Sequence, residues 1–226
     1  MRPDDLRAQQ LTLPALEDAR FSRARESLGE GAVILRGAAL DDATALLSDL
    51  ASALERAPLR HMVTPGGFRM SVAMTNCGAL GWVSDRAGYR YDALDPEGGR
   101  AWPAMPESFA RLSTSSAAAA GFDRFVADAC LVNRYDPGAR LTLHQDKNER
   151  DFTAPIVSVS LGLPAVFQFG GASRSERPRR VRLHHGDVVV WGGPSRLFFH
   201  GVLPLEDGEH PATGRHRINL TFRKAG

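Results

Sequence analysis

The sequence predicts an α+β fold that is mainly β, with two helices in the first half of the chain and a two-sheet barrel or jelly roll in the second. From about residue 130 onward, short segments of alternating apolar and polar residues follow one another, separated by turn dipeptides such as PG, LP, GG and GD. No helical segment lies between them, so the strands are expected to pair antiparallel. At 226 residues with 43% hydrophobic residues, the chain is long enough for one core, and we expect a single domain spanning residues 1–226.

Two helices are expected before the strands begin. The stretch DDATALLSDLASALERA places Ala43, Leu46, Leu47, Leu50 and Leu54 at helical spacing and ends before a proline. A second stretch, PESFARLSTSSAAAAG, begins with a proline and ends with a glycine, the usual order at the two ends of a helix. Both segments are interpreted as helices that pack on the core.

Between the helices, residues 61–95 alternate like short strands around the turn Pro65-Gly66-Gly67. This segment carries Trp82, Tyr89 and Tyr91, a high density in a chain that is only 8% aromatic. Aromatic side chains gathered in a turn-rich segment indicate either a local core or a binding surface.

The second half of the chain supplies eight predicted strands. One segment within it, SRSERPRRVR at residues 173–182, is rich in arginine and is interpreted as a solvated loop. The predicted strands are ACLVNRY, ARLTLHQD, PIVSVSLG, AVFQFGG, RVRLHH, DVVVWGG, RLFFHGV and RINLTFR.

Composition restricts the cellular setting. The first twenty residues are charged, and no apolar run approaches the roughly 18 residues that cross a membrane, so we expect a cytoplasmic protein without a membrane partner. Two cysteines, Cys77 and Cys130, are too few for a disulfide framework. A net charge of +2 gives no strong general attraction to nucleic acid, so any such binding must depend on the local distribution of charge.

Within LHQDKNE, residues 143–149, strand alternation would place His144 and Asp146 on one face. His200 ends the predicted strand RLFFH about fifty residues later. Two imidazoles and one carboxylate form the ligand set of non-haem Fe(II) oxygenases, but zinc hydrolases use the same set. The ligands alone therefore leave the metal open.

The last predicted strand carries arginines toward the same interior. In RINLTFR, alternation places Arg217, Asn219, Thr221 and Arg223 on one face and apolar residues on the other. Guanidinium groups inside a barrel are costly to bury unless an anion meets them. A dicarboxylate cosubstrate would satisfy this requirement.

Longer runs carry a specific family resemblance. They are GAVILRG, MVTPGGFRMSVAMTNCGALGW, WPAMP, NRYDPGA, HQD, PIVSVSLGLPAVFQFGG, GDVVVWGGPSRLFFHGV and RINLTFR. Through them the chain resembles the bacterial AlkB-type DNA dealkylation dioxygenases of the Fe(II)- and 2-oxoglutarate-dependent superfamily. The resemblance begins near residue 31 and leaves residues 1–30 as an N-terminal extension.

The resemblance implies a role for each matching position. It implies a double-stranded β-helix (jelly-roll) core at about residues 130–223 and a nucleotide-recognition lid at about residues 60–95. Fe(II) would be held by His144, Asp146 and His200, and 2-oxoglutarate by Asn133, Tyr135, Arg217, Asn219 and Arg223, with Arg223 on its distal carboxylate. Trp82 and His144 would sandwich a flipped-out base, and the nucleotide path would be lined by Thr64, Ser71, Met74, Tyr89, Asn148 and Arg174.

The implied reaction is oxidative demethylation of bases such as 1-methyladenine and 3-methylcytosine in DNA, single-stranded DNA in particular, by a monomer. It consumes 2-oxoglutarate and O₂ and releases succinate, CO₂ and formaldehyde. One position departs from the family pattern: Asn148 stands where a carboxylate is usual, which removes an attraction for a cationic methylated base.

Three alternatives stay open at this point. The chain could be a 2-oxoglutarate oxygenase acting on RNA or on a small molecule, although a small substrate gives no reason for the lid aromatics. It could be a zinc hydrolase, which the inward arginines oppose. It could be a catalytically silent nucleic-acid-binding module, which the intact His144, Asp146 and His200 oppose.

Overall fold

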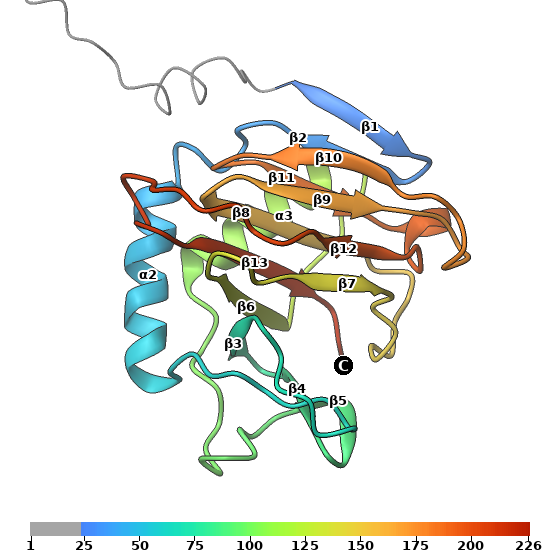
Figure 1. The fold of residues 1–226 in the computed structure, drawn as a ribbon. Coiled ribbons are helices and arrows are strands. Elements are labelled where there is room, and N and C mark those ends of the chain that lie inside the picture. The colour runs from blue at the N-terminus through green and yellow to red at the C-terminus, as the bar shows by residue number, and fades with distance from the viewer. Residues whose placement is uncertain (1–23) are drawn as a thin grey trace, which may run out of the picture.

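Two antiparallel sheets face each other in the computed structural model, which describes residues 24–226 (Figure 1). The larger sheet has the order β1-β2-β11-β8-β13-β6-β3, the smaller has the order β10-β9-β12-β7, and a separate hairpin pairs β4 with β5. The strands are β1 (Arg25–Gly29), β2 (Ala32–Leu35), β3 (Ala73–Gly78), β4 (Gly81–Asp85), β5 (Gly88–Asp92), β6 (Ala129–Tyr135), β7 (Leu141–His144), β8 (Ile156–Gly162), β9 (Ala165–Phe169), β10 (Arg179–Leu183), β11 (Val188–Trp191), β12 (His200–Val202) and β13 (Arg217–Arg223). The predicted jelly roll is confirmed.

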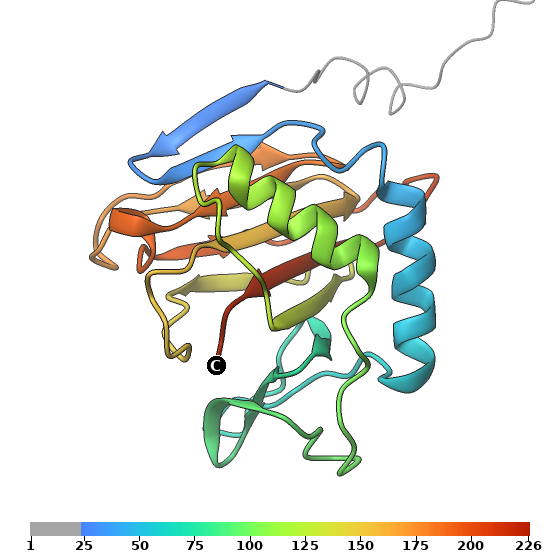
Figure 2. The ribbon, with the colours of Figure 1, turned by 180° about the vertical axis from the view of Figure 1, so that it is seen from behind.

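Both predicted helices are present. Helix α2 spans Ala43–Arg56 and α3 spans Glu107–Ala119, and a single-turn 3₁₀ helix, η1, covers Gly193–Ser195. Seen from behind, α3 crosses the outer face of the larger sheet and α2 stands at one end of the sandwich (Figure 2). Leu46 of α2 and Phe109 of α3 are fully buried in one apolar cluster with Val159 and Leu220 of the sheet. Helix α3 therefore covers one face of the larger sheet, and α2 packs against the same apolar cluster from one end.

A second apolar cluster fills the space between the two sheets. Ile34 and Val189 from the larger sheet meet Phe167 and Phe169 from the smaller, and Trp191 is packed among them. Strand alternation sends one set of side chains to the helix-covered core and the other set into the barrel. The inward-facing residues of β6 and β13 lie at the end of this barrel interior.

The β4–β5 hairpin lies below the sandwich in the view of Figure 1 and is tied to β3 by a side chain. The amide of Asn76 accepts a hydrogen bond from the backbone N–H of Trp82 (3.0 Å) and donates one to its carbonyl (2.9 Å). Trp82 is opposite Tyr91 in the hairpin register. The hairpin position is thus set by a strand that belongs to the larger sheet.

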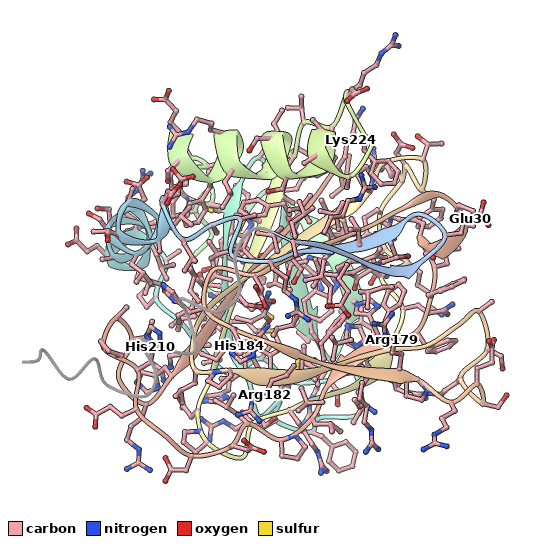
Figure 3. The ribbon with its side chains drawn as sticks, turned by 90° about the horizontal axis from the view of Figure 1, so that it is seen from above. Glu30, Arg179, Arg182, His184, His210 and Lys224 are labelled. Atoms are coloured by element: carbon pink, nitrogen blue, oxygen red, sulfur yellow. The ribbon has the colours of Figure 1, made fainter. Side chains whose placement is uncertain are left out.

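Two sequence predictions need correction. Strand β7 ends at His144, so Asp146 lies beyond the strand, because β7 is an edge strand and its neighbour β12 is only three residues long. The arginine-rich segment is not a loop throughout. Its second half forms β10, where Arg179 and Arg182 (labelled in Figure 3) pair with Glu26 and Glu206 at 2.6 Å and 3.2 Å.

Within residues 24–226, no helix has the length and apolar character needed to cross a membrane. Most of the N-terminal extension predicted for residues 1–30 lies outside the described residues.

Candidate metal and cosubstrate site

Three predicted metal ligands converge at the open end of the barrel. His144 ends β7, His200 begins β12 directly opposite it, and Asp146 follows β7 by two residues. The Nε2 atom of each histidine lies 3.8 Å from a carboxylate oxygen of Asp146. In the part of the chain that the structure describes, this is the one group of His, Cys, Asp or Glu side chains arranged to hold a metal ion, with ligand atoms all within 4.8 Å.

Backbone carbonyls fix the tautomer of both imidazoles. Nδ1 of His144 donates to the carbonyl of Thr142 (2.8 Å), and Nδ1 of His200 donates to that of Phe198 (3.0 Å). The proton is thereby held on Nδ1, and the Nε2 lone pairs point toward Asp146. Burial and the neighbouring His144 lower the pKa of His200 to about 4, which keeps it neutral and able to bind a metal.

Asp146 is held by two arginines. Nε and Nη2 of Arg223 donate to one carboxylate oxygen of Asp146 at 2.9 Å and 2.6 Å, and Nη1 of Arg196 donates to the Asp146 backbone carbonyl at 2.9 Å. Burial would raise the pKa of Asp146, but Arg223 and the two imidazoles outweigh it and hold the pKa well below its usual range. The carboxylate is therefore ionised and oriented before any metal binds.

Arg217, unlike Arg223, has donors that no group in residues 24–226 satisfies. Its side chain is 1% exposed, yet its Nε and Nη1 have no hydrogen-bond partner among the described residues. Its Nη2 donates to Ser160 Oγ at 3.0 Å, and the guanidinium lies 4.9 Å from the ring centre of Tyr135. A buried cation with two unsatisfied donors fits a site for an anionic ligand.

The other residues predicted to hold 2-oxoglutarate surround Arg217. Asn133 and Asn219 are in register on β6 and β13 and are joined by a hydrogen bond of 3.2 Å. Tyr135, opposite Arg217, is 1% exposed, and burial raises its pKa to about 12, so its hydroxyl remains a donor. Together, these buried polar groups fit a small, charged molecule with several oxygen atoms, as 2-oxoglutarate is.

Trp82 and Tyr89 of the β4–β5 hairpin stand beside the metal-ligand segment. The rings of Trp82 and Tyr89 stack with centroids 5.6 Å apart and planes at 15°. Nε1 of Trp82 donates to Oδ1 of Asn148 at 3.2 Å. The aromatic pair is therefore attached to the residue two positions after Asp146.

The remaining predicted nucleotide contacts divide into two groups. Thr64 and Ser71 are at or near the surface, and Arg174 donates to the carbonyl of Leu143, one residue before a metal ligand. Met74 is different, because it is 2% exposed and belongs to the inner apolar cluster. Met74 could line a nucleotide path only if the side chains that cover it moved.

Sequence reasoning missed three supporting residues. The Tyr91 hydroxyl donates to Glu149 (2.7 Å), and burial raises the pKa of Tyr91 well above its usual range. Glu149 is 6% exposed and also lies 3.2 Å from Arg196 and 3.4 Å from Arg223. Strand alternation could have placed Tyr91 on the face of Tyr89, but no local pattern marks Arg196.

Comparisons with known proteins agree with this geometry. The family described as "2OG-Fe(II) oxygenase superfamily" matches residues 31–223. The alpha-ketoglutarate-dependent dioxygenase AlkB of Salmonella typhimurium is 59% identical over 201 residues, covering 89% of this chain and 93% of that protein. The human nucleic acid dioxygenase ALKBH1 is 36% identical over 133 residues, covering 58% of this chain and 34% of that protein.

A solved structure supports the same family assignment. The structure of OsALKBH1 superimposes with a TM-score of 0.78 at 28% identity and covers 89% of this chain and all of that one. The family implies Fe(II) as the cofactor and 2-oxoglutarate and O₂ as cosubstrates; the ligand triad fits the metal, and the buried donors of Arg217 fit the anionic 2-oxoglutarate. The chain belongs to the 2OG-Fe(II) oxygenase superfamily and, within it, to the AlkB-type alpha-ketoglutarate-dependent dioxygenases.

Proposed function

We propose that this protein removes N-linked methyl groups from bases of nucleic acid, reversing alkylation damage such as 1-methyladenine and 3-methylcytosine in DNA. The observation that carries the proposal is the stacked pair Trp82–Tyr89, hydrogen-bonded to Asn148 beside the metal ligands. Flat aromatic faces next to a metal suit a planar base, whereas a small aliphatic substrate has no use for them. The name of the human relative, a nucleic acid dioxygenase, supports the same class of substrate.

His144, Asp146 and His200 would hold the metal, and the ordered imidazole tautomers favour binding through Nε2. When bound, Fe(II) together with 2-oxoglutarate and O₂ supplies an oxidant that hydroxylates the N-methyl carbon, and loss of formaldehyde then leaves the repaired base, with succinate and CO₂ as co-products. Arg223 keeps the Asp146 carboxylate ionised and in place. Two neutral donors and one anionic donor would leave positions open for the reactants.

The sequence prediction placed Arg223 on the distal carboxylate of 2-oxoglutarate, and our proposal differs on this point. We assign the distal carboxylate of 2-oxoglutarate to Arg217, because its Nε and Nη1 lack partners among the described residues, whereas Nε and Nη2 of Arg223 already donate to Asp146. Tyr135, Asn133 and Asn219 would complete the polar pocket. Burial of this pocket excludes bulk water from the reacting groups, which strengthens each electrostatic contact.

Residues 60–95 would act as a nucleotide-recognition lid on the catalytic core, within one domain. A target atom inside a base stack cannot reach the metal, so the base must be extruded or already single-stranded. Trp82 and His144 would hold the extruded base between them, and Thr64, Ser71, Tyr89 and Arg174 would contact the sugar-phosphate chain. We propose single-stranded DNA as the preferred partner and a monomer as the active form.

The experiment combines the protein with Fe(II), 2-oxoglutarate and a 1-methyladenine-containing single-stranded DNA oligonucleotide and measures formaldehyde and repaired adenine in the same samples. Equal amounts of the two products are expected. Parallel reactions with matched RNA and with duplex DNA rank the substrates. Absence of repaired base with all three, while 2-oxoglutarate is consumed, would contradict the proposal.

A further inference from the structure

The most exposed large hydrophobic side chain among the described residues belongs to the lid. Phe68 is 77% exposed, compared with 45% for Tyr89. Leaving an aromatic ring in water forgoes the stabilisation that burial would give. Neither the metal site nor the cosubstrate pocket accounts for this residue.

The backbone of Phe68 is held in a fixed turn. Its N–H donates to the hydroxyl of Thr64 (3.1 Å), its carbonyl accepts from the Thr64 N–H (2.9 Å), and Gly67 donates to the Thr64 carbonyl (2.8 Å). Gly67 adopts φ +83°, which favours glycine at this position. The ring is therefore presented outward by a turn that loses little further freedom when a ligand binds.

The turn is attached to the hairpin that carries the stacked aromatics. The Ser84 hydroxyl donates to the Val63 carbonyl at 2.6 Å, and Ser84 is opposite Tyr89 in the hairpin register. On the other side of the turn, a Cβ placed on Gly67 would lie 3.9 Å from Nη2 of Arg86. The turn that carries Phe68 is thus attached to the hairpin whose residues would receive the damaged base.

Two cations accompany the ring. Arg69 follows it in the chain, Arg86 lies beside its turn, and both are exposed. Among residues 24–226, neither forms an ion pair, unlike Arg90 of the same hairpin, which pairs with Asp85 at 3.0 Å. A flat apolar face flanked by unpaired positive charges matches the chemistry of a nucleotide, which combines a planar base with an anionic phosphate.

We propose that Phe68 is a second base-binding position, a stacking platform for a nucleotide next to the damaged one, with Arg69 and Arg86 near the adjoining phosphates. This inference rests on the proposed function and extends it, because it predicts that the enzyme recognises a strand and not only a modified base. A single methylated nucleotide cannot occupy the platform and the metal site together. A comparison of short and long substrates therefore tests whether Phe68 binds a second base.

The test compares 1-methyladenosine 5′-monophosphate with a methylated single-stranded pentanucleotide for wild type and Phe68→Ala. We expect kcat/KM for the pentanucleotide to fall about 5- to 150-fold, the range for loss of one base–aromatic stack, with the mononucleotide unchanged. Phe68→Trp should retain the wild-type value, and Phe68→Leu, which keeps an apolar group without a flat face, should lie between. Val126→Ala is the matched control, since Val126 is 69% exposed outside the lid.

Other outcomes have definite meanings. Equal loss on both substrates, or no loss on the pentanucleotide, overturns the platform while leaving the proposed function standing. If wild type repairs neither substrate, the proposed function itself fails. Concentration-dependent self-association in wild type that disappears in Phe68→Ala, measured by analytical ultracentrifugation, would assign the ring to a second copy of the chain and also overturn the platform.

Discussion

Strands β13 and β5 present opposite kinds of surface. All seven residues of β13, including two arginines, are buried, whereas no residue of β5 is fully buried. Arg223 of β13 is held by two short hydrogen bonds to Asp146, while the hairpin meets the metal-ligand segment through single hydrogen bonds from Trp82 and Tyr91. The residues proposed for the chemistry thus lie where the geometry is tightly determined, and those proposed for recognition lie where a large partner can approach.

This contrast predicts how substitutions should differ. Changes on the barrel interior should remove turnover or cosubstrate binding irrespective of the nucleic acid. Changes on the lid should alter the response to nucleic acid and leave the chemistry of the core intact.

The largest expected effect is at the metal site. His200→Ala should reduce turnover to background, because the metal loses one of three protein ligands. His200 is 5% exposed and packs 4.9 Å from the Trp191 ring centre, so about 1–3 kcal/mol of folding stability should also be lost. His144→Ala, at a half-exposed position, should lose turnover at a smaller cost in stability.

Metal titration and thermal unfolding measure the two effects separately. His216→Ala is the control, since His216 pairs with Asp136 at 2.8 Å on the surface and is not a member of the metal group. Wild-type turnover in iron-loaded His200→Ala would refute the assignment of the triad.

The next effect separates the two arginines of β13. Arg217→Leu should raise the KM for 2-oxoglutarate about 100-fold or more, since a buried carboxylate without its partner loses roughly 3–5 kcal/mol, and metal affinity should be preserved. Arg223→Leu should instead weaken metal binding about 10- to 100-fold, because Asp146 loses the group that orients it.

Calorimetric titration with Mn²⁺, followed by 2-oxoglutarate, distinguishes these outcomes. Arg215→Leu serves as a control, because its pair with Asp207 is exposed and contributes little. If Arg223→Leu raises the 2-oxoglutarate requirement with unchanged metal affinity, the sequence-based assignment of the distal carboxylate to Arg223 is the right one.

A smaller effect is expected on the lid. Trp82→Ala should weaken transition-state binding of a methylated base by about 1–3 kcal/mol, the usual contribution of one stack. Slow consumption of 2-oxoglutarate without nucleic acid should continue at the wild-type rate. Trp82→Phe keeps a ring but removes the hydrogen bond to Asn148, so it separates stacking from that contact. Loss of the background reaction in Trp82→Ala would indicate a structural role.

The smallest effect concerns Asn148, an exposed residue. Asn148→Asp retains an acceptor for Trp82 Nε1 and adds a negative charge near a cationic methylated base. We expect kcat/KM for 1-methyladenine to improve relative to a neutral etheno adduct by on the order of 1 kcal/mol, with the difference shrinking as salt rises. Equal changes for both adducts would mean that residue 148 acts through shape.

The sequence by itself predicted both helices, most strands and the kinds of ligand. Alternation placed Arg217 and Arg223 on the same side of β13, and helical spacing placed Leu46 and Leu50 on the buried face of α2. These are local properties, because the side-chain direction of a regular element follows from its period. The long family motifs also identified His144, Asp146 and His200 as a group.

Only the tertiary structure decided which hydrogen-bond partners Arg217 and Arg223 have. The pairing of Arg223 with Asp146 joins residues 77 positions apart, and the unsatisfied donors of Arg217 become visible only when every neighbour is known. Likewise, β7 stops at His144 because its neighbour in the sheet is short, which no feature of LTLHQD reveals. Hydrogen bonds and burial depend on contacts between distant segments, and strand period carries no information about them.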